Sequence, residues 1–143
     1  MKRIILIILM FSFGNLFSQN GLSPEQFMRY YVKVVNEEKI KEVQNCYHFP
    51  HSIIENGRIM YYDNAEIPVI DYNTFKKTGW VYSKINEIKV IAESGNTAIV
   101  QMDFSRFGKN DKEYLRTTMF YSLTKEKGYW QIINRTGMLN RTF

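Results

Sequence analysis

The chain has 143 residues, about 45% of them apolar, and a net charge of +5 at pH 7. This length provides for one domain with one hydrophobic core and is too short for two. Lysines and arginines are scattered among acidic residues without a basic cluster, which excludes the charge pattern of a nucleic-acid-binding surface or of a polybasic membrane patch.

The N-terminal segment has the three parts of a secretory signal peptide. Lys2 and Arg3 form a charged start, an apolar run extends from Ile4 to Phe13, and small and polar residues lead to Ser18. An uncleaved membrane anchor is the alternative, but the run is short of the roughly 20 residues that a spanning helix needs. We therefore predict a signal peptide over residues 1–18 and one exported domain over 19–143, periplasmic or extracellular, with no membrane contact after cleavage.

Cys46 is the only cysteine of the chain. An internal disulfide is therefore excluded, and the exported domain depends on its core. A nucleophilic role would need a base nearby, and His48 is the only candidate. We expect Cys46 to be a small buried apolar residue.

Three helices are predicted in the first half of the domain. Ser23 is a helix N-cap, followed by Pro24 in the first turn and by apolar residues at helical spacing up to Val35. A second helix is predicted over residues 37–45 and a third over 71–78. For the second, we expect a cap at Asn36 and inward-facing side chains at Ile40 and Val43.

A β-hairpin is predicted around Asn56-Gly57, a dipeptide typical of a type I′ turn. This turn sets Glu55 opposite Arg58 and His51 opposite Tyr62. Four long strands are then predicted as an antiparallel meander, with turn residues between them. They are Trp80–Glu93, Thr97–Phe107, Glu113–Lys125 and Tyr129–Thr136.

Alternation along the second of these strands predicts a buried face that ends in a charge. Ala98, Val100, Met102, Phe104 and Arg106 share this face. Asp103 is on the opposite face. Arg106 would then lie at the rim of an apolar surface, where it either contacts a ligand or pairs with Glu113 or Asp111.

His48 and His51 are the only histidines. An H-x-x-H pair supplies metal ligands when a helix brings both rings to one face, but Pro50 lies between the two residues and stops a helix. In an extended chain they point to opposite faces, so at most one lines a given pocket. We therefore expect no metal site and no cofactor.

The order of these elements resembles the nuclear transport factor 2-like superfamily, the cone-shaped fold that includes SnoaL-like polyketide cyclases and ketosteroid isomerases. Four stretches are similar to segments of its members: "FPH" at 49–51, "GW" at 79–80, "FSRF" at 104–107 and "KGYWQI" at 127–132. The resemblance covers residues 22–136. It implies an α+β fold in which N-terminal helices pack on a strongly curved antiparallel sheet, and a homodimer formed through the outer face of the meander, at Ile99 and Phe107.

The resemblance also suggests a pocket in the cone and a choice between two functions. An apolar mouth ringed by His, Tyr, Trp and Arg suits a small, flat, anionic organic molecule. The leading hypothesis is a domain that binds a small molecule or a protein partner without evident catalysis. The candidate pocket residues are His51, Tyr61, Trp80, Ser83, Met102, Phe104, Arg106, Tyr121 and Trp130.

The alternative is a cofactor-independent, SnoaL-like isomerase, cyclase or dehydratase. Its acid/base group would be His51 with Tyr61 or Tyr62 and Asp71. Ketosteroid-isomerase chemistry is disfavoured because Asp103 faces outward. For the pocket histidine, strand parity slightly favours His48, whereas the resemblance favours His51, which we adopt.

If the chain is exported as proposed, the exported protein should be shorter than the full sequence. The intact mass of material recovered outside the cytoplasm should lack residues 1–18, because the short apolar run directs cleavage rather than anchoring. A secreted product that retains Met1 to Ser18 would contradict this assignment.

Overall fold

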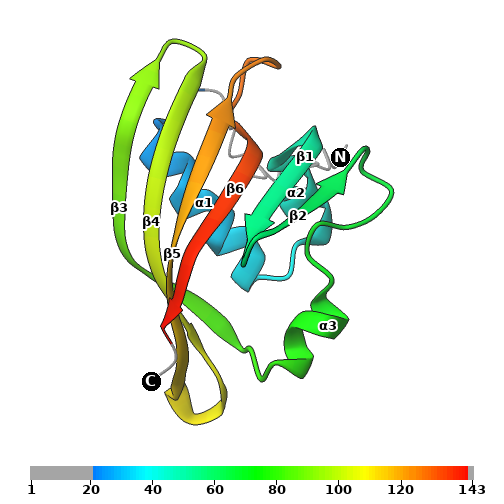
Figure 1. The fold of residues 1–143 in the computed structure, drawn as a ribbon, viewed down its shortest axis with the longest axis vertical. Helices are drawn as coiled ribbons and strands as arrows, with labels where there is room; N and C mark the ends of the chain where they lie inside the picture. The colour runs from blue at the N-terminus through cyan, green and yellow to red at the C-terminus, as the bar shows by residue number, and fades with distance from the viewer. Residues whose placement is uncertain (1–20, 142–143) are drawn as a thin grey trace, which may run out of the picture.

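The computed structural model describes the backbone of residues 21–141 and the side chains of residues 21–137. The predicted signal peptide lies outside these residues. The described chain folds into helices α1, α2 and α3 set beside one curved sheet of six strands (Figure 1). The sheet order is β2-β1-β6-β5-β4-β3. The prediction of an α+β fold with N-terminal helices on a curved sheet is confirmed.

Helix α1, Pro24–Asn36, begins as predicted. The Ser23 hydroxyl accepts a hydrogen bond from the Gln26 backbone, and the Gln26 side chain accepts one from the Ser23 backbone, which completes a capping box. One side of the helix is buried against the sheet. Its buried residues include Phe27, Met28, Tyr31, Val34 and Val35.

Helix α2, Ile40–Asn45, starts later than predicted, and two expectations about it are wrong. Glu38 has a positive φ of 53°, so the chain turns between α1 and α2 instead of continuing as a helix. Ile40 is consequently the first residue of α2 and is 59% exposed, whereas Val43 is buried as expected. Asn36 does not cap α2, because its side chain is bonded to the backbone N–H and C=O of Ser83.

Strands β1, Tyr47–Glu55, and β2, Arg58–Tyr62, form the predicted hairpin. Their register sets Glu55 opposite Arg58 and His51 opposite Tyr62. The Asn56-Gly57 turn has positive φ at both residues, which a type I′ turn requires. The turn chemistry therefore predicted the register of the hairpin correctly.

The other strands are β3 (Tyr82–Ser94), β4 (Thr97–Phe107), β5 (Glu113–Thr124) and β6 (Gln131–Arg141). A short 3₁₀ turn, η1 at Lys109–Asp111, joins β4 to β5. Strands β3 to β6 pair antiparallel as a meander, as predicted. The hairpin joins this meander through β1, which pairs parallel with β6. The sheet is thus mixed, not wholly antiparallel.

Helix α3, Tyr72–Lys77, lies below the β1–β2 hairpin in the view of Figure 1. Asp71 caps it by accepting hydrogen bonds from the Asn73 backbone and the Thr74 hydroxyl. Tyr72 anchors it to α1 through a bond from its hydroxyl to the Val35 carbonyl. Within residues 21–141, no helix has the length and apolar character needed to cross a bilayer.

Candidate functional site

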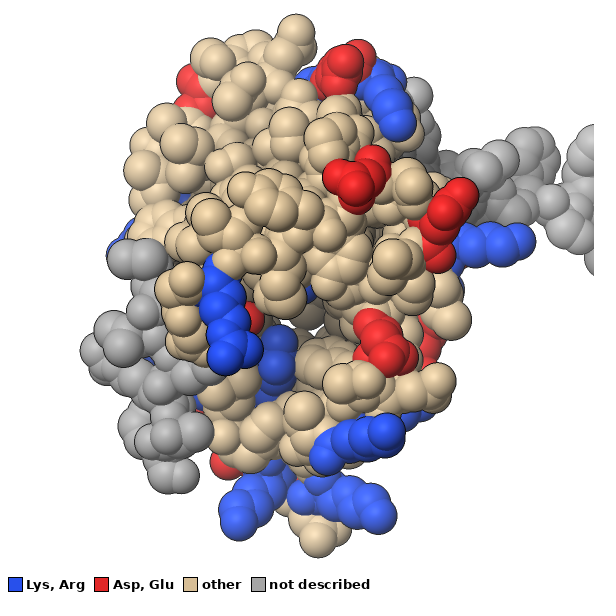
Figure 2. All heavy atoms as spheres, turned by 45° about the vertical axis from the view of Figure 1, so that its right-hand side comes forward, with Lys and Arg blue, Asp and Glu red and all other residues tan. Residues whose placement is uncertain are grey.

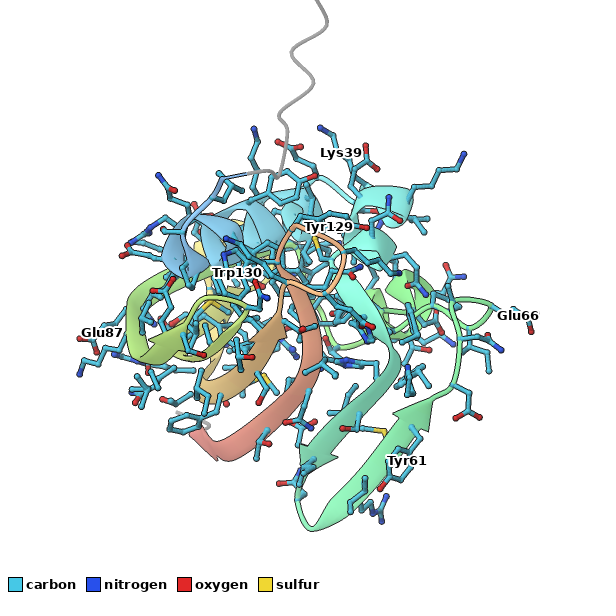
Figure 3. All side chains as sticks on the ribbon, turned by 90° about the horizontal axis from the view of Figure 1, so that it is seen from above. Lys39, Tyr61, Glu66, Glu87, Tyr129 and Trp130 are labelled. Atoms are coloured by element: carbon cyan, nitrogen blue, oxygen red, sulfur yellow. The ribbon has the colours of Figure 1, made fainter. Side chains whose placement is uncertain are left out.

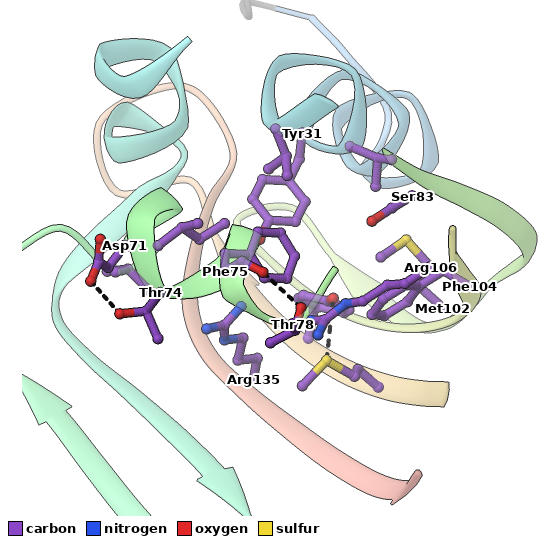
Figure 4. Close-up of a pocket in the computed structure, with 16 residues that line it drawn as sticks. Tyr31, Asp71, Thr74, Phe75, Thr78, Ser83, Met102, Phe104, Arg106 and Arg135 are labelled. Atoms are coloured by element: carbon purple, nitrogen blue, oxygen red, sulfur yellow. Dashed lines mark hydrogen bonds between the residues drawn. The ribbon is translucent and has the colours of Figure 1, made fainter. Parts of the chain in front are cut away.

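A cavity of about 310 Å³ lies between α1, α3 and the inner face of the sheet (Figure 4). Its walls are mainly apolar, with a few polar groups among them. The face of the molecule in Figure 2 is hollowed near its centre, and atoms of Lys or Arg are visible at this hollow. The lining residues are Tyr31, Val32, Val35, Val69, Ile70, Asp71, Thr74, Phe75, Thr78, Ser83, Met102, Phe104, Arg106, Met119, Tyr121 and Arg135.

The inner face of β4 supplies one wall, as strand alternation predicts. Met102 and Phe104 are buried, and Arg106 follows them at the end of the same face. Ser83 of β3 and Tyr121 of β5 also line the cavity. Five of the nine predicted pocket residues therefore meet in one cavity. Whether they bind a ligand stays a prediction.

Arg106 lies with its guanidinium against aromatic rings. Its terminal carbon is 4.6 Å from the centre of the Phe75 ring and 5.7 Å from that of Phe104. Its buried Nε has no hydrogen-bond partner within the described part of the chain, and it forms no ion pair there. Asp111, a partner considered from the sequence, instead accepts a hydrogen bond from the Tyr82 hydroxyl. Burial lowers the pKa of Arg106, but a guanidinium stays protonated at neutral pH.

Arg135 of β6 is a second guanidinium in the lining, and the sequence analysis missed it. Simple alternation from the buried Trp130 and Ile132 directs residue 135 to the outer face. The register between β5 and β6 shifts at this point: Leu123 is opposite Ile132, and the next pair joins Ser122 to Asn134. Ile133 is the extra residue of this bulge, so Arg135 returns to the inner face opposite the buried Tyr121.

The tyrosines beside Arg135 form a buried group. The hydroxyls of Tyr31 and Tyr47 are 2.6 Å apart and share a hydrogen bond, and the Tyr121 hydroxyl bonds to the Met119 sulfur at 3.7 Å. Burial raises the pKa of Tyr47 and of Tyr121, so both phenols stay neutral. Of this group, Tyr31 and Tyr121 line the cavity, and the Tyr121 hydroxyl brings no negative charge to it.

Asp71 is the only carboxylate among the described lining residues. The bond from Thr74 lowers its pKa, as do the backbone bonds at the start of α3. An ionised carboxylate committed to a helix cap is a poor general acid. Asp71 therefore stabilises the start of α3 at the edge of the cavity.

His51 lies in the core and does not line the cavity, contrary to the expectation. It is 1% exposed, its Nδ1 is 3.2 Å from the Ile132 carbonyl oxygen, and its ring centre is 4.7 Å from that of Tyr47. Burial and the charge of Arg135 lower its pKa to about 4. His51 is thus neutral at pH 7, donating from Nδ1 and leaving Nε2 without a described partner.

Three other predicted pocket residues also lie away from the cavity. Tyr61 is 70% exposed on the edge strand β2, far from α1 (Figure 3). Trp80 is buried, stacks on Phe75 and donates to the Ser83 hydroxyl, so it supports the wall from behind. Trp130 is buried near α1 and donates to the Leu22 carbonyl (Figure 3).

The candidate acid/base group is therefore not assembled. Of His51, Tyr61 and Asp71, only Asp71 borders the cavity. Tyr62 lies 6.1 Å from His51, ring centre to ring centre, and is likewise absent from the lining. His48 of β1 contacts Glu126, which belongs to the turn between β5 and β6.

Other sequence expectations concern groups outside the cavity. Asp103 faces away from it and accepts bonds from Asn86, Arg116 and Thr118. Cys46 is buried, as predicted, and burial raises the pKa of its thiol to about 12. Within the described residues, no group of three or more His, Cys, Asp and Glu side chains is placed to hold a metal ion.

The helix residues in the lining were missed because the sequence does not show how far α1 and α3 stand from the sheet. Tyr31, Val32 and Val35 belong to an apolar face that predicts core packing. Phe75 is an aromatic residue of the short helix α3. Only the folded chain shows that these side chains leave a space between them.

Residues 22–137 match the family described as NTF2-like protein (DUF6841), and the chain belongs to this family. No curated protein matches the chain. The predicted membership of the nuclear transport factor 2-like superfamily is confirmed by this match and by the fold.

Solved structures with the same fold are distant in sequence. A protein of unknown function with a cystatin-like fold from Nostoc punctiforme superposes with a TM-score of 0.63 at 10% identity, over 81% of this chain and 92% of that one. The β subunit of a candidate aromatic-ring-hydroxylating dioxygenase from Novosphingobium aromaticivorans superposes with a TM-score of 0.61 at 12% identity, over 83% of this chain and 87% of that one. A candidate ketosteroid isomerase from Shewanella frigidimarina superposes with a TM-score of 0.58 at 13% identity, over 78% of this chain and 91% of that one. These similarities show the fold alone.

The environment of His51 predicts a pH-dependent stability. Its folded-state pKa of about 4 lies below the ordinary value of 6.5, so the unfolded chain takes up a proton first as the pH falls. The free energy of unfolding should therefore fall by roughly 2 to 4 kcal/mol between about pH 6.5 and pH 4 on account of this residue. Urea unfolding of His51→Gln over this range should show a flatter pH profile than wild type.

His48→Gln is the matched control, because it removes the other histidine and leaves His51 buried. It should keep the steep profile. Equal pH slopes for wild type and His51→Gln would show that His51 does not titrate in this way.

Proposed function

We propose that this chain is an exported domain that binds a small, largely apolar organic molecule in the cavity between α1, α3 and the sheet. The observation that carries the proposal is Arg106, a charged side chain directed into an apolar cavity and unpaired within the described residues. A charge in such a place is costly without a partner. A ligand with an anionic group would supply that partner and bury its apolar part against Phe104 and Met102.

The dimensions of the site support a small molecule over a protein segment. Its volume of about 310 Å³ is at the lower end of the range for ligand pockets, and its walls mix many apolar groups with few polar ones. Tyr31 from α1 and Phe75 from α3 face the sheet residues across this space (Figure 4). A flat apolar molecule would fit between these layers.

Binding is favoured over catalysis because the candidate catalytic residues are separated. General acid/base chemistry needs its groups within hydrogen-bond reach of one substrate atom. Here His51 is enclosed in the core, Tyr61 is on the exposed edge strand and Asp71 caps α3. The isomerase, cyclase or dehydratase alternative has no specific observation in its favour.

Export is a further part of the proposal and rests on the sequence of residues 1–18. The domain has no disulfide because it has a single cysteine, which is buried. Its stability outside the cytoplasm would therefore come from the core between α1 and the sheet.

Arg106→Met should weaken the binding of an apolar acid such as 4-phenylbutyrate by roughly 1.5 to 3 kcal/mol, the contribution of charge-assisted hydrogen bonds. The methionine keeps much of the apolar stem against Phe75. The free energy of unfolding should change by less than about 1 kcal/mol, because no described acidic partner is left unpaired. Calorimetric titration and urea unfolding of the same variant measure the two effects.

Arg58→Met is the matched control, because Arg58 is exposed on β2 and outside the cavity. A second variant, Ile70→Trp, places an indole at the cavity and should block binding. Saturable binding that survives Ile70→Trp, or no binding by wild type, would refute the proposed function. A loss of about 3 kcal/mol or more in stability with unchanged affinity would assign Arg106 a structural role.

We also propose a homodimer formed through the outer face of the sheet. Ile99 is 41% exposed there, as expected. Phe107 is half-buried, because its ring stacks on Tyr82 with centres 4.9 Å apart, so it offers less apolar surface than the sequence suggests. Sedimentation equilibrium at micromolar concentration should give twice the mass of one chain. Ile99→Lys should shift the measured mass toward that of a single chain. A wild-type mass of one chain would contradict the dimer.

A further inference from the structure

The cavity contains two arginines that share one environment and have no counter-charge. Arg106 reaches it from β4 and Arg135 from β6, and each has a buried Nε without a hydrogen-bond partner in the described chain. Neither forms an ion pair with a described carboxylate. Asp71, the lining carboxylate, is bonded to Thr74 and to the α3 backbone instead.

The two guanidinium groups are near enough to affect each other. Both side chains line the same cavity. Burial is the main reason why the pKa of Arg106 is lowered, and the positive charge of Arg135 lowers it further. In Figure 4 the guanidinium of Arg106 lies beside Thr78 and that of Arg135 lies below Phe75. Like charges brought together in an apolar space repel one another.

The contacts that the arginines do make are weak substitutes for an anion. Arg106 lies over the Phe75 ring, and Arg135 is 6.0 Å from the centre of the Tyr47 ring. A cation–π contact leaves the N–H donors of the guanidinium free. Tyr47 and Tyr121 remain neutral, so they do not neutralise the charge. The donors of two arginines therefore remain available to one acceptor group.

We propose that a single carboxylate bridges Arg106 and Arg135, so that the ligand of this cavity is a hydrophobic carboxylic acid. This inference rests on the proposed function and specifies its ligand class. A planar carboxylate matches the fork of donors on a guanidinium and has two oxygens, one for each arginine. The apolar side chains around it, among them Met102, Phe104 and Met119, hold the rest of the molecule.

A carboxylate fits this site better than a free inorganic anion. Phosphate would occupy only the charged end and leave the apolar walls without a partner. An acid with an apolar body contacts both parts of the cavity. The site should therefore bind an apolar acid more tightly than the corresponding neutral alcohol or inorganic phosphate.

The test is calorimetric titration of the full exported domain with 4-phenylbutyrate, 4-phenylbutan-1-ol and inorganic phosphate. Wild type should bind the acid about 10- to 100-fold more tightly than the alcohol or phosphate. Arg135→Gln and Arg106→Gln should each remove most of that preference. The double variant should be little weaker than the weaker single variant, because one group bridges both side chains.

Arg58→Gln is the control for loss of a positive charge and should leave the affinity for the acid unchanged. Arg135→Lys keeps the charge but removes the fork. This variant should lower the affinity for the acid by about 10-fold. It serves as the second variant if Arg135→Gln does not fold. Unchanged affinity in either folded Arg135 variant, or effects of Arg106 and Arg135 that simply add, would refute the bridge.

The outcomes separate this inference from the proposed function. Equal binding of acid and alcohol that Ile70→Trp abolishes would refute the carboxylate bridge and retain a small-molecule cavity. Tighter binding of phosphate than of the acid would identify a free inorganic anion as the occupant and also refute the bridge. Absence of saturable binding for both aromatic probes would refute both proposals.

Discussion

The packing of α1 across the inner face of the sheet is the contact on which the rest of the structure depends. Phe27, Met28 and Val34 of this helix are almost fully buried and belong to the hydrophobic core. Toward α3 the same helix presents Tyr31 and Val35 to the cavity instead. The same helix thus contributes side chains both to the core and to the cavity wall. The Asn36 bonds to Ser83 hold the end of this helix against β3, so the cavity wall has a fixed position.

Local chemistry explains which features could be predicted from the sequence. The Ser23 cap and the Asn56-Gly57 turn act within a few residues, so the start of α1 and the hairpin register follow from them. The alternation of β4 is regular from Ala98 to Arg106 and correctly predicts its inner face. The position of Arg135 depends on the bulge at Ile133, which appears only in the pairing of β6 with β5. The parallel contact of β1 with β6 likewise depends on how distant segments meet.

The site combines positive charge with neutral polar groups, and this balance supports recognition more than proton transfer. A group that exchanges protons needs a pKa near the working pH. The buried groups here are shifted away from it: His51 is neutral, and the phenols of Tyr47 and Tyr121 are neutral as well. The guanidinium groups carry charge next to the apolar walls, and they keep it across the physiological pH range. The electrostatic character of the cavity is therefore constant while the stability of the surrounding core depends on pH.

The hairpin strand β2 has a consequence for the behaviour of the protein in concentrated solution. It is one of the two edge strands of the sheet, and its residues Ile59, Met60 and Tyr61 are all exposed. An edge strand leaves backbone donors and acceptors unpaired on its outer side, and natural proteins usually protect such edges with charges, prolines or bulges. Arg58 is the only charged residue within β2. Edge-to-edge aggregation would therefore begin most readily at this strand, on the opposite side of the sheet from β3.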